Sequence, residues 1–411
     1  MRIVIATAVY YPMINGVAVF SHNLAQGLLK RGHEVLVLCP SQTGKNFIEN
    51  QNGVKVHYLR SVEAKVYPDR IHDVPKRKKL FGIELPHILY KHGFRVSVFP
   101  QLEVKQILGQ FKPDVVHVQV SDPIGLSVVS YARKHGVPVV TTEHNQPEVI
   151  TEPLKMPKFI KKPADALLAA YFANRQSKSD FVTMPTKKAI YKLLEGRGLE
   201  VPVAAVSNGV DLSYFKPGEA PKELYKKFGL NDESLTVLYV GRVDPEKSVG
   251  MVVEAFLKAD VKNSQLVVVG DGVDLARLQK KYTDAKNVYF LGRIIPPELY
   301  EIYRLGDVFA TASEIETQGI VLIEAAASGL PLVAVDAGAV SEICIDGENG
   351  FLCEPKSVNE IAEAIKKILS DAKLRKEFTK KSIEIASGHD FERTLDQFEN
   401  IYKKVQEKRA P

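Results

Sequence analysis

A charged loop in the second half of the chain carries the residue types that bind phosphate groups. Arg242 and Lys247 lie five residues apart, directly after the apolar run Leu235–Val240. Gly241 between them and that run is typical of a strand that ends in a turn. An arginine fork and a lysine point charge at such a turn suit a diphosphate. An ordinary surface loop is the alternative interpretation.

The segment 313–324 places two carboxylates around the start of a helix. Glu316 lies just before that helix, and Glu324 lies inside it among apolar residues. A carboxylate in apolar surroundings needs a partner, and the vicinal hydroxyls of a ribose or hexose can donate to it. Main-chain N–H groups at a helix start also suit a phosphate or a sugar hydroxyl. These residues are Gln318, Gly319 and Ile320. Alternatively, Glu316 caps the helix and Glu324 pairs with an arginine.

The elements that position these loops are predicted to be strands and helices in alternation, as in an α/β protein. Apolar runs rich in valine and isoleucine alternate with amphipathic stretches such as Val17–Arg31 and Gly319–Ser328. Continuous apolar strands separated by helices predict parallel sheets that are covered on both faces. The predicted strands are Arg2–Thr7, Glu34–Cys39, Val115–Val118, Pro138–Thr142, Phe181–Met184, Val203–Val206, Thr236–Val240, Gln265–Val269, Val288–Leu291, Val308–Thr311 and Pro331–Val335.

The alternation of strands and helices forms two separate series in the 411 residues. We therefore predict an α/β protein with two doubly wound, Rossmann-like domains that face each other across a cleft. The polar stretch Asp211–Glu233 separates the two series. We predict domains at residues 1–212 and 213–390, followed by a C-terminal segment, 391–411.

Composition and missing motifs exclude several classes of protein. No G-x-G-x-x-G follows either first strand, which disfavours a dehydrogenase, and no Walker A, HExxH or GxSxG sequence occurs. The three cysteines are too few for a disulfide framework and lack the spacing of a zinc site. No apolar run approaches the roughly 20 residues that cross a bilayer, and no signal peptide is visible, so we expect a cytoplasmic protein.

Ordered motifs over nearly the whole chain resemble those of the retaining glycosyltransferases of family 4, which have the GT-B fold. Glu316 and Glu324 fit the E-x7-E motif of that family. Arg242 and Lys247 fit its GRxxxEK motif. The other matching segments are Asn15–Val17, Leu28–Val35, Pro113–His117, Thr142–His144, Asn208–Pro217, Val269–Gly272 and Leu291–Arg293.

The resemblance implies how a nucleotide sugar would be bound. Arg242 and Lys247 would hold its diphosphate, and Glu324 would bind its ribose hydroxyls. Glu316 would contact hydroxyls of the hexose, and His144 would lie near the anomeric centre and the 6-hydroxyl. The remaining contacts would come from Gly16 at the phosphate, from Gln318, Gly319 and Ile320 at the hexose, and from Arg293 or Ile294 at the base. His117 is interpreted as a packed core histidine.

The resemblance also implies retention of anomeric configuration without a metal ion or a cofactor, the nucleotide sugar being a substrate. Two cations and a helix N-terminus would stabilise the leaving diphosphate. No Asp-x-Asp pair of metal ligands occurs in the chain. In the family, the leaving phosphate takes the proton of the acceptor, and the C-terminal segment forms a helix that returns to the first domain.

The tetrad 316–319 resembles that of the diacylglycerol glucosyltransferases of bacterial membranes, which use UDP-glucose. Glu143, Asn145 and Ala339 depart from the pattern of that group, which puts the acceptor in doubt. Transfer to a soluble or polyprenyl-linked glycan, or of mannose to a phosphoinositol-type lipid, is the alternative within this class. A sugar-nucleotide epimerase is the alternative from another class.

The charge of the chain differs between its halves. Residues 1–200 carry a net charge of +12, and residues 201–411 carry −6. Two basic segments with apolar residues, Pro75–Ile83 and Leu154–Tyr171, favour contact with an anionic membrane. We therefore expect a peripheral protein on the inner face of the cell membrane, with a lipid acceptor and no nucleic-acid partner. Solvent-facing lysines over core residues are the alternative, and Pro153, Pro157 and Pro163 are expected to break any long amphipathic helix.

Overall fold

The structure is a computed structural model that describes residues 1–11, 15–63, 79–80, 83–84, 95–119, 122–144, 157–194 and 200–409. The chain divides into two compact units. Unit 1 consists of Met1–Ser207 and Thr394–Pro411, and unit 2 consists of Asn208–Arg393. The structure thus places the boundaries at 207/208 and 393/394, where the sequence had suggested 212/213 and 390/391.

Unit 1 is built on an eight-stranded sheet with the strand order β12-β11-β10-β9-β1-β2-β4-β3. All neighbouring strands are parallel except β3, which pairs antiparallel with β4. The strands are β1 (Arg2–Ala6), β2 (Glu34–Pro40), β3 (Phe47–Gln51), β4 (Val54–Leu59), β9 (Val115–Val118), β10 (Val139–Thr142), β11 (Phe181–Met184) and β12 (Val203–Ala205). Two small two-stranded sheets accompany it: β5 (Ser61–Glu63) with β8 (Arg95–Ser97), and β6 (Lys79–Leu80) with β7 (Ile83–Glu84).

Helices cover both faces of this sheet because alternate strand residues point to opposite sides. Val4 and Ala6 of β1 pack in one core with residues of α2 and α3. The helices that the structure describes in unit 1 are α1 (Gly16–Lys30), α2 (Gln101–Phe111), α3 (Pro123–Lys134), α5 (Lys158–Gln176), α6 (Lys187–Leu194) and, for nearly all of its length, α14 (Phe391–Glu407). Asn15 caps α1 because its Oδ1 accepts a hydrogen bond from the main-chain N–H of Ala18.

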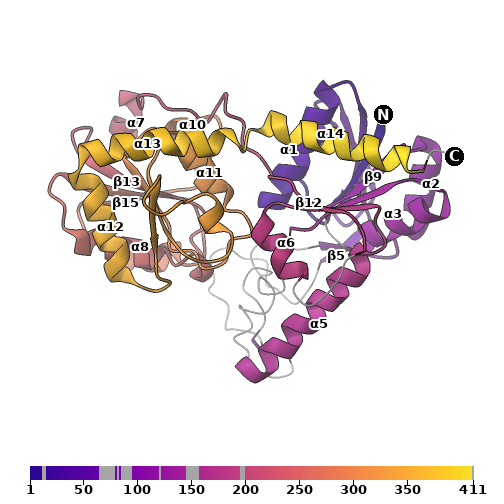
Figure 1. The fold of residues 1–411 in the computed structure, drawn as a ribbon, viewed down its shortest axis with the longest axis horizontal. Helices are drawn as coiled ribbons and strands as arrows, with labels where there is room; N and C mark the ends of the chain where they lie inside the picture. The colour runs from indigo at the N-terminus through magenta and orange to yellow at the C-terminus, as the bar shows by residue number, and fades with distance from the viewer. Residues whose placement is uncertain are drawn as a thin grey trace. The chain divides into compact units, whose positions relative to one another are not determined.

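The C-terminal helix α14 lies beside α1 in unit 1 (Figure 1). Arg31, which follows α1, forms ion pairs with Asp396 and Glu399 of α14 at 2.7 and 2.8 Å. Phe398 of α14 packs against Phe20 of α1 with ring centroids 6.0 Å apart. The last element of the chain therefore completes the core of the first unit.

Unit 2 contains a six-stranded parallel sheet with the order β15-β14-β13-β16-β17-β18. The first strand lies in the middle, and the chain adds strands first to one side and then to the other. In such a doubly wound sheet, ligands bind where the strand order reverses, here between the carboxyl ends of β13 and β16. The strands are β13 (Leu235–Val240), β14 (Ser264–Val269), β15 (Val288–Gly292), β16 (Val308–Ala310), β17 (Leu332–Val335) and β18 (Gly350–Cys353).

The two faces of this sheet carry separate hydrophobic cores. Val237 and Tyr239 of β13 pack with α8 and α12, whereas Leu238 and Val240 pack with α10 and α11 on the other face. The helices are α7 (Lys222–Phe228), α8 (Val249–Ala259), α9 (Leu275–Lys281), α10 (Glu298–Tyr303), α11 (Ile320–Ala327), α12 (Val358–Ser370) and α13 (Ala372–Ser387), with 3-10 turns at Pro245–Lys247 and Val340–Glu342.

All eleven predicted strands are confirmed to within two residues at each end. The prediction that prolines break a long helix here was wrong for Pro163, because α5 continues through it to Gln176. Pro157 directly precedes α5, and Pro153 lies outside the described residues. Pro163 lies near the start of α5. Because proline has no main-chain N–H, the helix loses one hydrogen bond there. The basic segment Pro75–Ile83 lies almost wholly outside the described residues, as do residues 154–156. Within the described parts of the chain, no helix is long and apolar enough to span a bilayer.

Candidate active site

The loops that carry the predicted phosphate ligands lie at the switch point of unit 2. Gly241–Lys247 follows the central strand β13, and residues 311–319 follow its neighbour β16. Because both strands end at the same edge of a parallel sheet, the two loops lie side by side. Lys247 and Glu316, predicted separately from two motifs 69 residues apart, are in direct contact there.

Arg242 is held by carboxylates of its own loop. Its Nη1 forms ion pairs with Asp244 and, at 2.8 Å, with Oε1 of Glu246. Asp244 is 3% exposed and uses its other oxygen, Oδ1, to accept a hydrogen bond from the main-chain N–H of Val273 at 3.0 Å. These carboxylates raise the pKa of Arg242 against the effect of burial, so the guanidinium is charged. The main-chain oxygen of Arg242 accepts a hydrogen bond from Tyr239 at 2.7 Å.

Two glycines after β14 bring a second loop against the Arg242 loop. A Cβ at Gly270 would lie 1.8 Å from the main-chain oxygen of Gly241, and one at Gly272 would lie 1.9 Å from that of Val243. Main-chain hydrogen bonds join the loops, from Val243 to Asp271 at 2.9 Å and back from Asp274 to Val243 at 3.0 Å. Only glycine allows so close an approach, so the VGDG segment supports the loop that carries Arg242.

Lys247 is fixed by the loop after β16. Its Nζ donates to Oε1 of Glu316 at 2.5 Å, to Oγ of Ser313 at 3.2 Å and to the main-chain oxygen of Ile315 at 3.3 Å. Both side chains of the ion pair are about five-sixths buried, with exposed fractions of 15% and 16%. The ammonium group is thus held in one place, beside the carboxylate predicted to contact the hexose.

The start of α11 has the geometry expected of an anion or hydroxyl site. Gly319 caps the helix with φ of +78°, a left-handed conformation that favours glycine. Gln318, 2% exposed, accepts a hydrogen bond from the main-chain N–H of Asn208 through its side-chain oxygen at 3.1 Å. Gly338 lets another loop approach Glu316, because a Cβ there would lie 2.5 Å from the main-chain oxygen of Glu316.

Glu324 has a protein partner that the sequence did not predict. Tyr303 of α10, fully buried, donates its hydroxyl to Oε2 of Glu324 at 2.5 Å. Burial raises the pKa of Glu324 to about 7, although the Tyr303 hydroxyl acts in the opposite direction. The arginine partner considered from the sequence is thus replaced by a tyrosine, and the carboxyl group exchanges a proton near neutral pH.

The residues predicted to contact the nucleotide base follow β15, at the edge of the sheet. Gly292 ends this strand at φ of +71°, and its main-chain oxygen accepts a hydrogen bond from Gly270 at 2.7 Å. Arg293 is exposed, and Ile294 packs against the core beside α10 and α11. This places the two residues one strand beyond the loop of Gly270 and Gly272.

Unit 1 carries two of the predicted residues. Gly16 begins α1 just after the loop that follows β1, and its main chain is exposed. His144 follows β10 and is 8% exposed, and burial lowers its pKa to about 4. Its Nε2 donates to Oε1 of Gln119 at 2.8 Å. His117 is fully buried in β9, as predicted for a packed core histidine.

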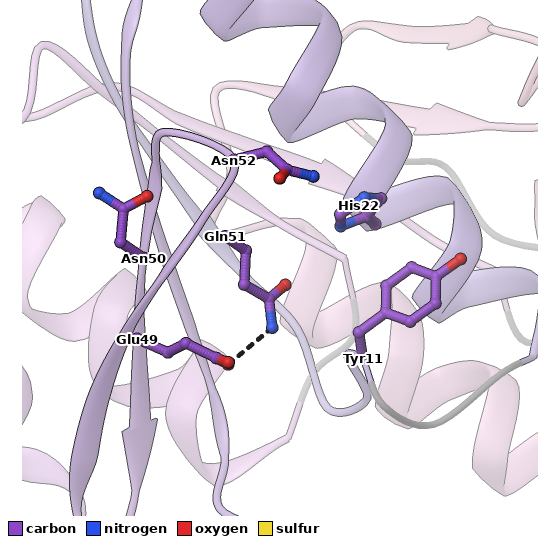
Figure 2. Close-up of a pocket in the computed structure, with 6 residues that line it drawn as sticks. All are labelled: Tyr11, His22, Glu49, Asn50, Gln51 and Asn52. Atoms are coloured by element: carbon purple, nitrogen blue, oxygen red, sulfur yellow. Dashed lines mark hydrogen bonds between the residues drawn. The ribbon is translucent and has the colours of Figure 1, made fainter.

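A shallow depression in unit 1 contains none of the predicted residues (Figure 2). It lies between α1 and the β3–β4 hairpin and is lined by Tyr11, His22, Glu49, Asn50, Gln51 and Asn52. The Gln51 amide in this depression already has protein partners, because it donates to Glu49 at 2.8 Å and to Tyr58 at 2.8 Å. The candidate site therefore lies at the carboxyl ends of β13 and β16, and not in this depression.

The structure thus gives each predicted residue a place in one of the units, and it brings Lys247, Glu316 and the start of α11 together in unit 2. The sequence did not single out Asp244, Tyr303 or Gln119, which hold the predicted residues in position. Among the residues that the structure describes, no group of three or more histidine, cysteine and acidic side chains could hold a metal ion.

Comparison with known proteins places this geometry in a family. The family model "Glycosyltransferase Family 4" matches residues 14–214, and "Glycosyl transferases group 1" matches residues 221–384. Together the two models span most of both units. The chain therefore belongs to the family 4, group 1 glycosyltransferases.

Individual relatives share most of the chain. The alpha-monoglucosyldiacylglycerol synthase of Acholeplasma laidlawii is 28% identical over 363 residues, covering 85% of this chain and 84% of the relative. A GDP-mannose-dependent alpha-mannosyltransferase of Mycobacterium tuberculosis is 29% identical over 358 residues, covering 86% and 83%. The solved structure of Anabaena HepE in complex with UDP-glucose has a TM-score of 0.71 at 17% identity and covers 98% of this chain and 100% of HepE. The fold is thus the GT-B fold, with two Rossmann-like domains.

Proposed function

We propose that this glycosyltransferase moves a hexose, glucose from UDP-glucose, to a membrane lipid such as diacylglycerol with retention of anomeric configuration. The observation that carries the proposal is the contact of Lys247 and Glu316 at the switch point of unit 2, beside the start of α11. In this contact, Lys247, which is proposed to bind the diphosphate, lies next to Glu316, which is proposed to bind the hexose. The similarity to a glucosyldiacylglycerol synthase and the UDP-glucose bound by HepE favour the donor and the acceptor.

The nucleotide sugar would exchange contacts with the existing ion pair. Its diphosphate competes with Glu316 for Lys247, and the hexose hydroxyls then donate to the released Glu316. Arg242 keeps its position because Asp244 and Glu246 hold it from its own loop. The arginine therefore needs little ordering when it binds, which lowers the entropic cost of binding.

The residues of unit 2 would also lower the barrier to bond cleavage. Breaking the bond between the hexose and the phosphate builds negative charge on the leaving diphosphate. Arg242, Lys247 and the main-chain N–H groups at the start of α11 stabilise that charge, and they are already in position before the reaction. The leaving phosphate would take the proton of the acceptor hydroxyl, with attack on the same face of the sugar. We propose no side-chain nucleophile, no metal ion and no cofactor.

Helix α5 in unit 1 supports a lipid acceptor. Phe159 and Leu167 are 78% and 73% exposed, and Ile160 and Tyr171 are 44% and 42% exposed. Ile160, Leu167 and Tyr171 are spaced by seven and four residues and so share one face of the helix. Lysines 161 and 162 lie in the same helix. An apolar face with adjacent lysines is typical of a helix that lies in the surface of an anionic membrane.

The mannosyltransferase relative favours one alternative, transfer of mannose from GDP-mannose to a phosphoinositol-type lipid. The alternatives share the chemistry of unit 2 and differ in the base, the hexose and the acceptor. We would therefore incubate the purified protein with radiolabelled UDP-glucose, UDP-galactose, GDP-mannose or ADP-glucose, each with diacylglycerol vesicles or an extracted lipid pool. Label from UDP-glucose in an organic-soluble product supports the proposal. Label that enters lipid only from GDP-mannose, or enters only soluble glycans, contradicts it.

Membrane contact is tested separately by sedimentation with vesicles of phosphatidylglycerol and phosphatidylcholine at low salt. We expect the wild type to sediment and the double variant Phe159→Ser/Leu167→Ser to remain largely in the supernatant. Leu102→Ser is a matched control, because Leu102 is 80% exposed on α2 in the same unit. Equal sedimentation of all three proteins would remove α5 from the proposal.

A further inference from the structure

A buried glutamine ties the loop after β16 to the first residue of unit 2. Oε1 of Gln318 accepts a hydrogen bond from the main-chain N–H of Asn208 at 3.1 Å. The two residues are 110 positions apart in the sequence, and both belong to unit 2. Gln318 is 2% exposed and Asn208 is 7% exposed, and a hydrogen bond is stronger in such an interior than in water. The side chain of Gln318 therefore fixes the end of this loop, just before Gly319 and α11.

Asn208 is a firm attachment point because hydrogen bonds hold the chain on both sides of it. On one side, Oγ1 of Thr394 donates to the main-chain oxygen of Ser207 at 2.9 Å. On the other side, the main-chain N–H of Val210 donates to the main-chain oxygen of His389 at 2.9 Å. The N–H of Asn208 is thus presented to Gln318 by a segment that is itself fixed.

The same loop has another attachment, which the nucleotide sugar is proposed to remove. Nζ of Lys247 bonds to the carboxylate of Glu316, and in the proposed function the diphosphate competes for this ammonium group. Two attachments do not involve Lys247. One is the bond between Gln318 and Asn208, and the other is the main-chain N–H of Ala339, which donates to the main-chain oxygen of Glu316 at 3.2 Å. The loop therefore depends more on Gln318 when the diphosphate is bound than when it is absent.

We propose that Gln318 is a positioning residue for the nucleotide sugar. Its side chain holds the loop against Asn208, so that Glu316 and the main-chain N–H groups at the start of α11 keep their places when the diphosphate engages Lys247. This inference rests on the proposed function, which binds the nucleotide sugar in unit 2, and it adds a role for the Gln318 side chain. A loop that is ordered in advance loses less conformational entropy on binding, so the bond raises the affinity for the donor.

Unit 2 contains a matched hydrogen bond away from the candidate site. Oε1 of Gln265, which is also 2% exposed, accepts the main-chain N–H of Asn231 at the same distance of 3.1 Å. Gln265 is the second residue of β14, near the amino end of that strand, whereas the candidate site lies at carboxyl ends. Gln318→Met and Gln265→Met thus remove the same kind of bond and retain an unbranched side chain. A general loss of stability affects both variants, but a positioning role affects only Gln318→Met.

Hydrogen exchange tests the bond directly, without a substrate. The amide of Asn208 should exchange slowly in the wild type and about 10-fold faster or more in Gln318→Met, because its N–H then lacks an acceptor. Gln318→Glu keeps an oxygen at this position, so exchange should remain slow. Equal exchange in the wild type and in Gln318→Met would overturn the proposal. Fast exchange in Gln318→Glu would also overturn it, and this variant decides if Gln318→Met does not fold.

Calorimetric titration with UDP, and in parallel with GDP and ADP, tests the positioning role. For the diphosphate that the wild type binds, we expect Gln318→Met to weaken binding by about 10-fold and Gln265→Met by less than about twofold. With the corresponding nucleotide sugar, KM should rise by a similar factor in Gln318→Met, while kcat falls by less than about threefold. A lower kcat at unchanged KM, or an equal loss of affinity in both variants, would overturn the positioning role.

The two kinds of failure are distinguishable. Wild-type protein that binds none of the three diphosphates, or that transfers no sugar from any donor, contradicts the proposed function. Wild-type protein that binds a diphosphate and transfers sugar, while Gln318→Met keeps the wild-type affinity, contradicts the positioning role alone. Thermal unfolding of Gln318→Met and Gln265→Met shows whether the two variants lose stability to a similar extent.

Discussion

The two units hold their candidate residues in different ways. In unit 2, the cations Arg242 and Lys247 are fixed by ion pairs with Asp244, Glu246 and Glu316. In unit 1, His144 is neutral and is fixed by neutral hydrogen bonds through Gln119. The candidate cations of unit 2 are thus held in compensated ion pairs, whereas the candidate histidine of unit 1 is held without charge.

This difference suits the proposed chemistry. A diphosphate carries charge, and a site that binds it can exchange one ion pair for another at low cost. A neutral sugar hydroxyl carries none, and it is recognised by the direction of a hydrogen bond. The two units should therefore respond differently to loss of charge and to pH.

The largest effect is expected from loss of the central cation. Lys247→Ala removes a charge next to the leaving diphosphate and leaves Glu316 without its ion-pair partner, so we expect transfer to fall by roughly 1,000-fold or more. The measurement is the initial rate of transfer from the donor that the wild type uses. Lys281→Ala removes an exposed ion pair with Glu254 in the same unit and should leave the rate unchanged. An active Lys247→Ala enzyme would remove the diphosphate assignment.

The next effect is a pH dependence of stability with opposite signs for two groups, Glu324 in unit 2 and His144 in unit 1. The folded pKa of Glu324 is raised from 4.5 to about 7, so the contribution of this group to stability is lost as pH rises through that window. The folded pKa of His144 is lowered from 6.5 to about 4, so the stability it contributes above 6.5 is lost as pH falls through that window. Each shift corresponds to a change on the order of 3 kcal/mol across its window.

Hydrogen exchange measured by mass spectrometry, with peptides assigned to each unit, separates the two responses between pH 5 and 8. Glu324→Gln should flatten the response of unit 2, and His144→Gln should flatten part of that of unit 1. Glu377→Gln and His135→Gln change exposed residues of the same types and serve as controls. Glu324→Gln and His144→Gln variants whose pH responses match that of the wild type would contradict this prediction.

The sequence predicted the fold well because most strands are buried on both faces. Every residue of Val115–Val118 and Leu332–Val335 is buried, and His117 is the one residue of these two strands that is not apolar. The edge strand β3 was missed because four of its five residues are exposed, so Phe47–Gln51 carries no alternating pattern. Helix α5 was underestimated because Pro163 was given more weight than the helix formers after it.

The sequence also predicted the residues that lie at strand ends, since Arg242 and Lys247 directly follow β13 and Glu316 follows β16. It did not reveal the residues that hold them. Tyr303 gains its role only when α10 and α11 pack together, and Tyr402 meets His117 across 285 positions. No local pattern marks such partners, because the distance along the chain carries no information about contact in the folded protein.

The smallest predicted effect concerns the partner of Glu324. Tyr303→Phe removes one buried hydroxyl while keeping the ring, so we expect a loss of stability of about 1–3 kcal/mol, measured by urea unfolding at pH 7. The hydroxyl lowers the pKa of Glu324, so its loss should raise that pKa further and move the pH response of unit 2 to higher pH. Combining Tyr303→Phe with Glu324→Gln should cost less than the sum of the two single changes, because both remove the same hydrogen bond. Additive losses would show that the Tyr303 hydroxyl stabilises the fold independently of Glu324.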